Sequence, residues 1–175
     1  MEYTWHYHSP LGNVTLASNG SELTGLWFDD QKYFAATLSP EHKPKNLPIF
    51  EQTSNWLDIY FSGRAPNFTP PLHLQASPFR LAVWQILQQI PFGQTITYAE
   101  IACQMAAPKS AQAVGGAVAH NPISLIIPCH RVVGTSGSLT GYAGGLDKKQ
   151  YLLALEGIKL NKLTTNGKGA RLKNE

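Results

Sequence analysis

The sequence predicts an α+β protein with a small strand-rich part at the N-terminus and a mainly helical part after it. Short runs of β-branched and aromatic residues, separated by turn sequences, occupy the first 30 residues. Amphipathic helical patterns with capping residues dominate from residue 77 onward, and a proline-containing stretch lies between the two. We therefore expect a support domain with its linker over residues 1–75, a second domain over 76–162 and a polar basic tail over 163–175.

Three strands are expected near the N-terminus, over residues 3–8, 14–18 and 23–28. Turn sequences at residues 10–13 and 18–21 separate them, which is the pattern of an antiparallel meander. His6 and His8 fall on one face of the first strand. No thiol or carboxylate accompanies them, so we expect solvent-facing residues there and no metal site.

The rest of this part is expected to hold two helices. Residues 31–38 suggest a short helix, and residues 41–47 a polar loop. Pro48 opens a longer helix that runs to Phe61, because proline is tolerated in the first turn and the apolar residues recur at helical spacing. Residues 65–75 read as a linker that could add one more strand.

Three helices with recognisable caps are expected after the linker. Ser77 caps the first, Thr97 and Glu100 form a capping-box pattern at the second, and Ser110 caps the third, which runs to Ala119. Two helices joined by a tight turn, the second small and exposed, indicate a helix-turn-helix.

The third of these helices, Ala111-Gln-Ala-Val-Gly-Gly-Ala-Val-Ala119, has very little side-chain bulk. Its paired glycines cost about 1 kcal/mol each relative to alanine. Such a helix allows close approach either of another protein element or of a nucleic-acid backbone. It carries few groups that could read base edges, which favours recognition of shape or backbone.

The most reactive group is predicted at Cys129, within Pro128-Cys-His-Arg131. Thiol reactivity follows the thiolate fraction, and cationic neighbours raise that fraction. The apolar residues 123–127 are expected to run extended to the thiol and to deliver it to a pocket. The alternative is an inert, buried structural cysteine beside a surface His-Arg pair.

A glycine-rich loop and a last helix follow. The loop covers residues 134–145, and a tyrosine flanked by glycines, Tyr142, could wall a planar ligand. Asp147 is expected to cap the helix, with Gln150 at the capping-box position. Glu156 lies near the helix C-terminus, where the helix dipole disfavours a carboxylate. It therefore needs a partner, for which His130 is the candidate.

Composition excludes several classes of protein. No run of 18 apolar residues occurs, so no membrane-spanning helix is expected, and the first residues lack the pattern of a signal peptide. The two cysteines are too few for a disulfide scaffold or a cysteine-rich zinc site, and Cys103 is expected to be a buried packing residue. Residues 1–75 carry a net charge of −3 and residues 76–175 a net charge of +6. The basic second part indicates a polyanionic partner.

Together these motifs resemble the O6-alkylguanine-DNA alkyltransferases. The resemblance covers residues 77–158 and rests on four linked motifs at residues 113–122, 128–132, 141–145 and 152–157. It implies a ribonuclease H-like N-terminal domain and a winged-helix-like C-terminal domain. It also implies DNA repair, in which an alkyl group, mainly methyl, passes from O6 of guanine (also O4 of thymine) to Cys129 in one irreversible turnover. The implied protein is a monomer that acts on duplex DNA without a cofactor, in the cytoplasm or, in a eukaryote, the nucleus.

The resemblance also assigns roles to residues of this chain. Cys129 is the nucleophile, His130 accepts its proton through a water held by Asn121, Glu156 orients the imidazole, and Tyr98 donates a hydrogen bond to the base. The implied substrate pocket consists of Val132, Tyr142, Ala143 and Ser124. The implied DNA contacts are Thr97, Tyr98, Ala111, Gln112 and Gly115. Arg131 is assigned to an ion pair or to backbone hydrogen bonds.

One departure from the family pattern keeps an alternative open. Gln112 stands where the family usually has an arginine that replaces the flipped base in the stack, and glutamine lacks both the charge and the planar fork of that side chain. The alternative is a non-catalytic protein that binds alkylated bases. A cysteine hydrolase with the same Cys-His-Glu set is a further reading, and it would turn over many substrate molecules.

Overall fold

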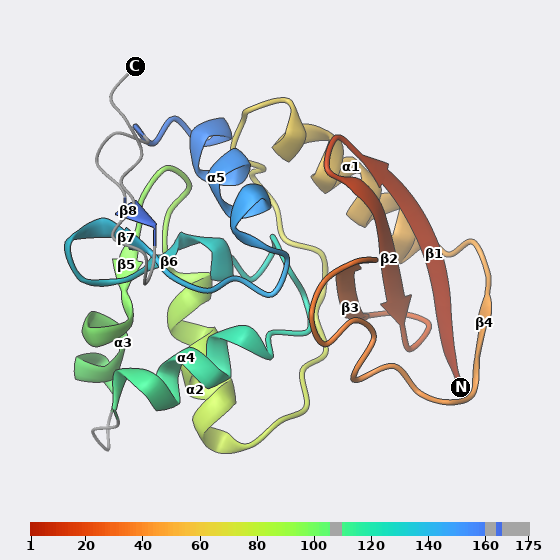
Figure 1. The fold of residues 1–175 in the computed structure, drawn as a ribbon. Helices are drawn as coiled ribbons and strands as arrows, with labels where there is room; N and C mark the ends of the chain where they lie inside the picture. Colours follow the sequence, from red (N-terminus) through yellow and green to blue (C-terminus); the bar gives the residue numbers. More distant parts are fainter. Residues whose placement is uncertain (106–109, 160–163, 166–175) are drawn as a thin grey trace. The chain divides into compact units, whose positions relative to one another are not determined.

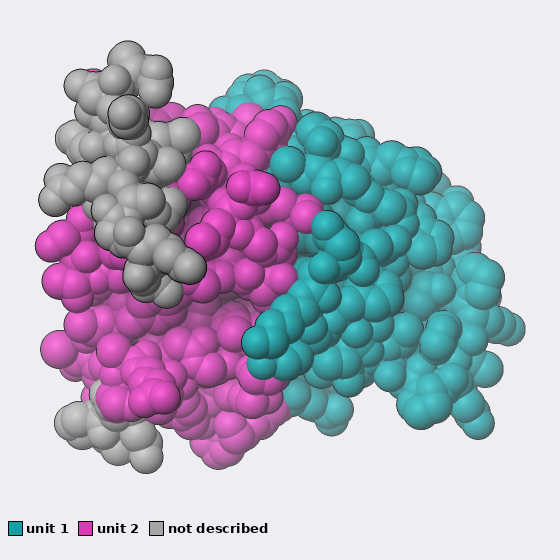
Figure 2. All heavy atoms as spheres, in the orientation of Figure 1, with its two compact units in different colours: residues 1–75, 122–126 teal, residues 76–121, 127–175 magenta. Residues whose placement is uncertain are grey.

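The computed structural model describes residues 1–105, 110–159 and 164–165, and the chain forms two compact units. Unit 1 contains residues 1–75 and 122–126, and unit 2 contains residues 76–121 and 127–175 (Figure 2). Strands dominate unit 1 and helices dominate unit 2, so the predicted α+β class is confirmed. In the described parts of the chain, no helix has both the length and the apolar character needed to cross a membrane.

Unit 1 is built on a four-stranded sheet in the order β3-β2-β1-β4 (Figure 1). β1 (Glu2–Ser9), β2 (Gly12–Ser18) and β3 (Leu23–Phe28) form the predicted antiparallel meander. β4 (His42–Pro44) pairs parallel with β1, where the sequence predicted a loop. All three β4 residues are exposed, so no alternation of apolar residues marks them as a strand.

α1 (Pro48–Phe61) has the predicted bounds and packs against β1 and β2. Its buried stripe includes Trp56 and Tyr60, whose rings stack with centroids 5.4 Å apart. Residues 31–38 do not form the predicted helix. Tyr33 and Ala35 have φ values of 61° and 52°, in the left-handed region that a right-handed helix excludes.

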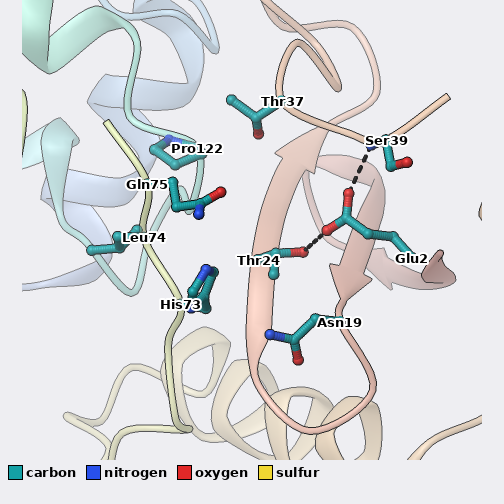
Figure 3. A pocket seen from close by; sticks show the side chains of 9 residues that line it. All are labelled: Glu2, Asn19, Thr24, Thr37, Ser39, His73, Leu74, Gln75 and Pro122. Atoms are coloured by element: carbon teal, nitrogen blue, oxygen red, sulfur yellow. Dashed lines mark hydrogen bonds between the residues drawn. The ribbon is translucent and has the colours of Figure 1, made fainter. Parts of the chain in front are cut away.

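A polar cavity of about 380 Å³ lies within unit 1 (Figure 3). Both oxygens of the Glu2 carboxylate accept hydrogen bonds there. Oε2 accepts from the Thr24 hydroxyl at 2.5 Å, and Oε1 accepts from the Ser39 amide at 2.7 Å. These bonds tie the first strand to β3 and to the loop before β4. None of the residues lining this cavity is a predicted site residue, so the predicted chemistry lies elsewhere.

Unit 2 contains four helices in its described part: α2 (Pro78–Gln88), α3 (Tyr98–Gln104), α4 (Ala111–Ala119) and α5 (Leu146–Leu155). The predicted caps Ser77, Thr97 and Ser110 each accept a backbone N–H, and Thr97 completes its capping box with Glu100. The predicted Asp147 cap is wrong. The N-cap is Gly145, whose φ of 100° turns the chain into the helix two residues earlier.

Short elements complete unit 2. η1 (Cys129–Arg131) precedes β6 (Val132–Val133), which pairs parallel with β5 (Ile96–Thr97). The glycine-rich loop holds η2 (Thr135–Gly137) and β7 (Ser138–Leu139), and β7 pairs with β8 (Thr164–Thr165). The predicted turn before Ser110 and the rest of the predicted tail lie outside the described residues.

The helix-turn-helix elements pack on α2. α4 contacts both α2 and α3, and the buried Trp84 indole donates to the Ala117 carbonyl at 2.8 Å. The prediction of a buried Cys103 is wrong, because this thiol is exposed on α3. Ile101 and Ala102 supply the buried side of that helix.

Residues 123–127 do not run extended to the thiol as predicted. Leu125 has a φ of 71°, and the Ile126 N–H donates to the Ser124 carbonyl at 2.8 Å across it. This is a γ-turn of the strained left-handed type. Residues 122–126 belong to unit 1, although residues of unit 2 flank them in the sequence.

Candidate active site

The local backbone fixes the position of Cys129. Pro128 has φ −80° and ψ 68°, and the Cys129 N–H donates to the Ile127 carbonyl at 2.8 Å, which defines an inverse γ-turn at the proline. The proline ring restricts φ, so this turn is formed with little loss of backbone entropy. η1 begins at Cys129, and the residue is 4% exposed.

Asn121 directly follows the C-cap of α4 and fixes residues 127–129, which lead to and include the nucleophile. Its side-chain amide donates to the Ile127 carbonyl at 2.7 Å. It also hydrogen-bonds the Cys129 thiol, and this bond lowers the thiol pKa. The same buried amide therefore fixes the backbone before the cysteine and contacts its sulfur.

Burial has the largest effect on the thiol. It raises the pKa of Cys129 above the ordinary value, while the Asn121 hydrogen bond, the charge of Lys149 and the nearby Tyr142 hydroxyl oppose it. The expectation that its neighbours hold the sulfur anionic is therefore wrong for the resting site. Desolvation outweighs these opposing effects, so the thiol is neutral near pH 7 until its proton is removed.

His130, Glu156 and Arg131 form a buried cluster. Glu156 Oε2 lies 2.6 Å from His130 Nε2, and Arg131 reaches both carboxylate oxygens, at 2.8 Å from Nε and 3.1 Å from Nη2. Arg131 Nη1 also donates to the Ile90 carbonyl, and the Gly93 N–H donates to Glu156 Oε1, at 2.7 and 2.8 Å. The predicted His130–Glu156 pair and the predicted ion pair of Arg131 are both present.

The protonation states in this cluster follow from its contacts. Burial alone would raise the pKa of Glu156, but His130 and Arg131 lower it to about 2, so the carboxylate is ionised. Burial lowers the pKa of His130, which keeps the imidazole neutral at pH 7. A neutral imidazole whose Nε2–H donates to a carboxylate carries its lone pair on Nδ1. Nδ1 is thus the basic nitrogen of this histidine.

Lys149 is a site residue that was not predicted from the sequence. It is fully buried on α5, and Nζ donates to three carbonyls, those of Val132, Gly141 and Thr140, at 2.5, 3.0 and 3.1 Å. Burial lowers its pKa to about 8, and its charge lowers the pKa of Cys129. The adjacent Lys148 and Lys149 look alike in the sequence, so only a helical-face argument from the buried Leu152 and Leu153 could have separated them.

Two tyrosines flank the thiol. The buried Tyr142 hydroxyl interacts with Cys129, and burial together with that contact raises the tyrosine pKa. Tyr98 donates to the Thr140 carbonyl at 2.9 Å, and its ring lies 6.0 Å from Lys149 Nζ. Burial raises the pKa of Tyr98 as well. Both hydroxyls therefore stay protonated at neutral pH and can donate hydrogen bonds.

The predicted pocket residues do not all fall in one unit. Val132 is buried directly after η1, and Ala143 follows Tyr142 in the half-buried loop. Ser124 lies in unit 1, where its hydroxyl donates to Gln31 Oε1 at 3.3 Å. Its predicted role in shaping the substrate pocket stays a prediction.

The predicted DNA contacts lie along α3 and α4. Ala111 and Gln112 are exposed on α4, and Thr97 caps α3. A Cβ atom on Gly115 would meet the Tyr98 ring at an ordinary 3.8 Å, and one on Gly116 would meet nothing within 4 Å. Close packing inside the protein therefore does not require these glycines, which favours the reading that their face is left open for a backbone from outside.

The fold and the site define a class of protein: a strand-rich unit joined to a helix-turn-helix unit that holds a buried, hydrogen-bonded thiol and a Glu-His pair. No group of three His, Cys, Asp or Glu residues within the described ranges could hold a metal ion.

Comparison with known proteins identifies the family to which such a protein belongs. Residues 78–158 match the 6-O-methylguanine DNA methyltransferase DNA binding domain, and residues 3–74 match the ribonuclease-like domain of the same methyltransferase. A methylated-DNA--protein-cysteine methyltransferase of Mycolicibacterium paratuberculosis is 47% identical over 85% of this chain and 88% of its own. That of Haemophilus influenzae is 40% identical over 95% and 93%. The crystal structure of Mycobacterium tuberculosis OGT in complex with DNA superposes with a TM-score of 0.78 at 43% identity, covering 89% of this chain and 91% of that one. The chain belongs to the 6-O-methylguanine DNA methyltransferase family.

Proposed function

We propose that this chain repairs DNA by transferring an alkyl group, mainly methyl, from O6 of guanine, and also from O4 of thymine, to its own Cys129. The observation that carries the proposal is the buried Cys129 thiol, hydrogen-bonded by Asn121 and next in sequence to a histidine that an ionised Glu156 holds in one tautomer. The thioether product is stable, so each molecule acts once. Family membership and the curated names of its relatives support this reading.

The chemical step needs a thiolate, which the buried site does not hold at rest. His130 Nδ1 takes the thiol proton through a water held partly by Asn121, and Glu156 stabilises the resulting imidazolium, as in a Cys-His-acid triad. The sulfur then attacks the alkyl carbon, so that a carbon–sulfur bond forms while the carbon–O6 bond breaks. The departing guanine gains a proton, which the proton taken from the thiol balances overall, and the Tyr98 hydroxyl donates a hydrogen bond to the base. Its present bond to the Thr140 carbonyl must be exchanged for one to the base.

The partner is duplex DNA. An O6-alkyl carbon is out of reach inside a base stack, so the nucleotide must be flipped into the site. α3 and α4 supply the helix-turn-helix, with Thr97, Tyr98, Ala111, Gln112 and Gly115 on the DNA side. Tyr142, Ala143 and Val132 line the base pocket of unit 2, and the part expected for Ser124 of unit 1 stays a prediction. The Mycobacterium tuberculosis relative crystallised with DNA supports this assignment.

We place the reaction where the DNA is, in the cytoplasm or, in a eukaryote, the nucleus. Cys103 and Cys129 are both free thiols, which suits a reducing compartment. The proposed reaction uses no cofactor and needs only a monomer. We assign residues 1–75 to a support domain, residues 76–162 to the catalytic domain and the residues after them to a basic tail.

Mass spectrometry after incubation with a duplex containing O6-methylguanine tests the proposal. We expect one adduct of about 14 Da, the mass of a methyl group that replaces hydrogen, on the peptide of Cys129. The exposed Cys103 is the internal control and should stay unmodified, although it is the more accessible thiol. Binding of the damaged duplex without an adduct would favour the lesion-binding alternative, and repeated turnover of a substrate would favour a hydrolase.

Gln112 is expected to limit flipping of the damaged base. Replacing it by arginine should raise the single-turnover rate on methylated duplex several-fold. The reason is that the charged, planar guanidinium group can fill the gap that the flipped base leaves in the stack. Position 112 is exposed on α4, so the change should not affect folding. Quench-flow rates of the wild type and of Gln112→Arg measure the effect, with Gln85→Arg at an exposed position of α2 as the matched control. An equal or slower rate for Gln112→Arg would contradict it.

A further inference from the structure

Residues 122–126, directly before the nucleophile segment, are anchored in unit 1. The Leu26 N–H donates to the Pro122 carbonyl, and the Ser124 N–H donates to the Leu26 carbonyl, both at 2.9 Å. Ile123, between these two bonds, forms a β-bridge with Leu26 and is fully buried. The segment therefore acts as a short extra strand at the β3 edge of the sheet.

Gln31 provides the side-chain anchor of this segment. Its Oε1 accepts from the Phe28 N–H at 2.9 Å and from the Ser124 hydroxyl at 3.3 Å, and its amide donates to the Lys32 carbonyl at 3.4 Å. Gln31 is 6% exposed and Ser124 is 3% exposed, so water does not compete freely for these bonds. A single buried acceptor thus links the end of β3 to the segment.

The anchor holds a strained turn in place. Leu125, next to Ser124, has a φ of 71°, which is strained for a non-glycine residue and persists only where its surroundings fix it. This turn redirects the chain toward the inverse γ-turn that presents Cys129. Asn121 hydrogen-bonds both the Ile127 carbonyl and the Cys129 thiol, so it fixes the residues between this turn and the nucleophile.

We infer that Gln31 is a positioning residue for alkyl transfer, because its side-chain carbonyl holds Ser124 and thereby the strained turn that aims Cys129. The inference rests on the proposed function. The hydrogen bonds of Gln31 go to Phe28, Lys32 and Ser124, all in unit 1. Its effect passes along the covalent chain, through Leu125 and Ile127, to the bonds that Asn121 makes.

Three variants of the full-length chain test this role. Gln31→Leu keeps the size of the side chain and removes the acceptor. Gln31→Glu keeps an acceptor for both donors and should rescue. Thr53→Val is the matched control, because it deletes a buried hydrogen bond of unit 1, from the Thr53 hydroxyl to the Ile49 carbonyl at 2.8 Å, that does not involve this segment. Urea unfolding puts the variants on one stability scale.

We expect Gln31→Leu to lower the maximal single-turnover transfer rate about tenfold, as small misplacements of reacting groups do. The DNA concentration at half-maximal rate should stay within about twofold of wild type, because the DNA-binding face is not touched. Gln31→Glu and Thr53→Val should both transfer at close to the wild-type rate.

Alkylation by iodoacetamide gives a second readout that does not depend on DNA. In Gln31→Leu, labelling of the buried Cys129 should rise several-fold relative to the exposed Cys103 of the same molecule, and in Thr53→Val the ratio should not change. If Gln31→Leu and Thr53→Val behave alike in both readouts, the positioning role is wrong. If the wild type itself transfers no methyl group, the proposed function fails, and the labelling ratio still decides the role of Gln31.

Discussion

Glu156→Gln should slow methyl transfer to Cys129 about a thousandfold, within the range seen when a general base loses its support. The glutamine amide would present an N–H where the carboxylate accepted one from His130 Nε2 at 2.6 Å. The imidazole would then favour the opposite tautomer and lose both its basic Nδ1 and the anion that stabilises its protonated form. Single-turnover rates at saturating methylated duplex measure the loss.

The same substitution should also change how stability depends on pH. The carboxyl titrates near pH 4.3 in the unfolded chain and at about 2 in the folded one, so the unfolded state takes up the proton first as the pH falls. The stabilisation by ionised Glu156 is therefore complete above about pH 4.3 and is lost as the pH falls toward 2. Urea unfolding between pH 2 and 6 should show this loss in the wild type and not in Glu156→Gln.

Asp147→Asn is the control for both measurements. It removes a carboxylate from the same helix at an exposed position, and it should leave transfer and acid stability close to wild type. Glu156→Gln is expected to lose roughly 3–5 kcal/mol of stability near neutral pH, because it uncouples a buried arginine. Rates must therefore be compared at equal folded fraction. A Glu156→Gln rate within tenfold of the wild-type rate would refute the role given to the carboxylate.

Local rules predicted the features that depend on neighbours in sequence. α1 and α4 have the predicted bounds, and the caps at Ser77, Thr97 and Ser110 form as expected, because each cap joins residues only three positions apart. The pairing of His130 with Glu156 followed from the cost of a carboxylate at a helix C-terminus. A single unfavourable position can thus point to a distant partner.

Features fixed by tertiary contacts escaped prediction. β4 is a strand only because its backbone meets the edge of β1, and the left-handed Leu125 is set by contacts with residues almost 100 positions away. The protonation of Cys129 is another such case. Neither the depth of burial that raises the thiol pKa nor Lys149, the cation that opposes it, could be identified from the residues next to Cys129. Lys149 was missed because only its position on the helical face of Leu152 and Leu153 separates it from the adjacent Lys148.

Lys149→Met should reduce methyl transfer to Cys129 roughly a hundredfold and lower the stability of unit 2. The lysine is the buried cation that favours the thiolate, and methionine fills a similar volume without the charge. Loss of this cation should raise the thiol pKa further, so that less thiolate is available at a given pH. The rate of iodoacetamide labelling at Cys129 as a function of pH measures that shift, with Cys103 as the reference.

The stability effect of Lys149→Met has a separate origin. Nζ satisfies the carbonyls of Val132, Thr140 and Gly141, and methionine would leave all three without this donor. The Val132 contact is buried, and its carbonyl costs about 1–3 kcal/mol when it lacks this donor. Loss of the two contacts to Thr140 and Gly141 should let the glycine-rich loop detach before the helices unfold. Hydrogen exchange should show the loop amides losing protection first. Lys148→Met, the half-buried neighbour on the same helix, should change neither the thiol pKa nor loop protection. If both substitutions gave the same transfer rate at equal folded fraction, Lys149 would be a structural residue with no electrostatic role in the chemistry.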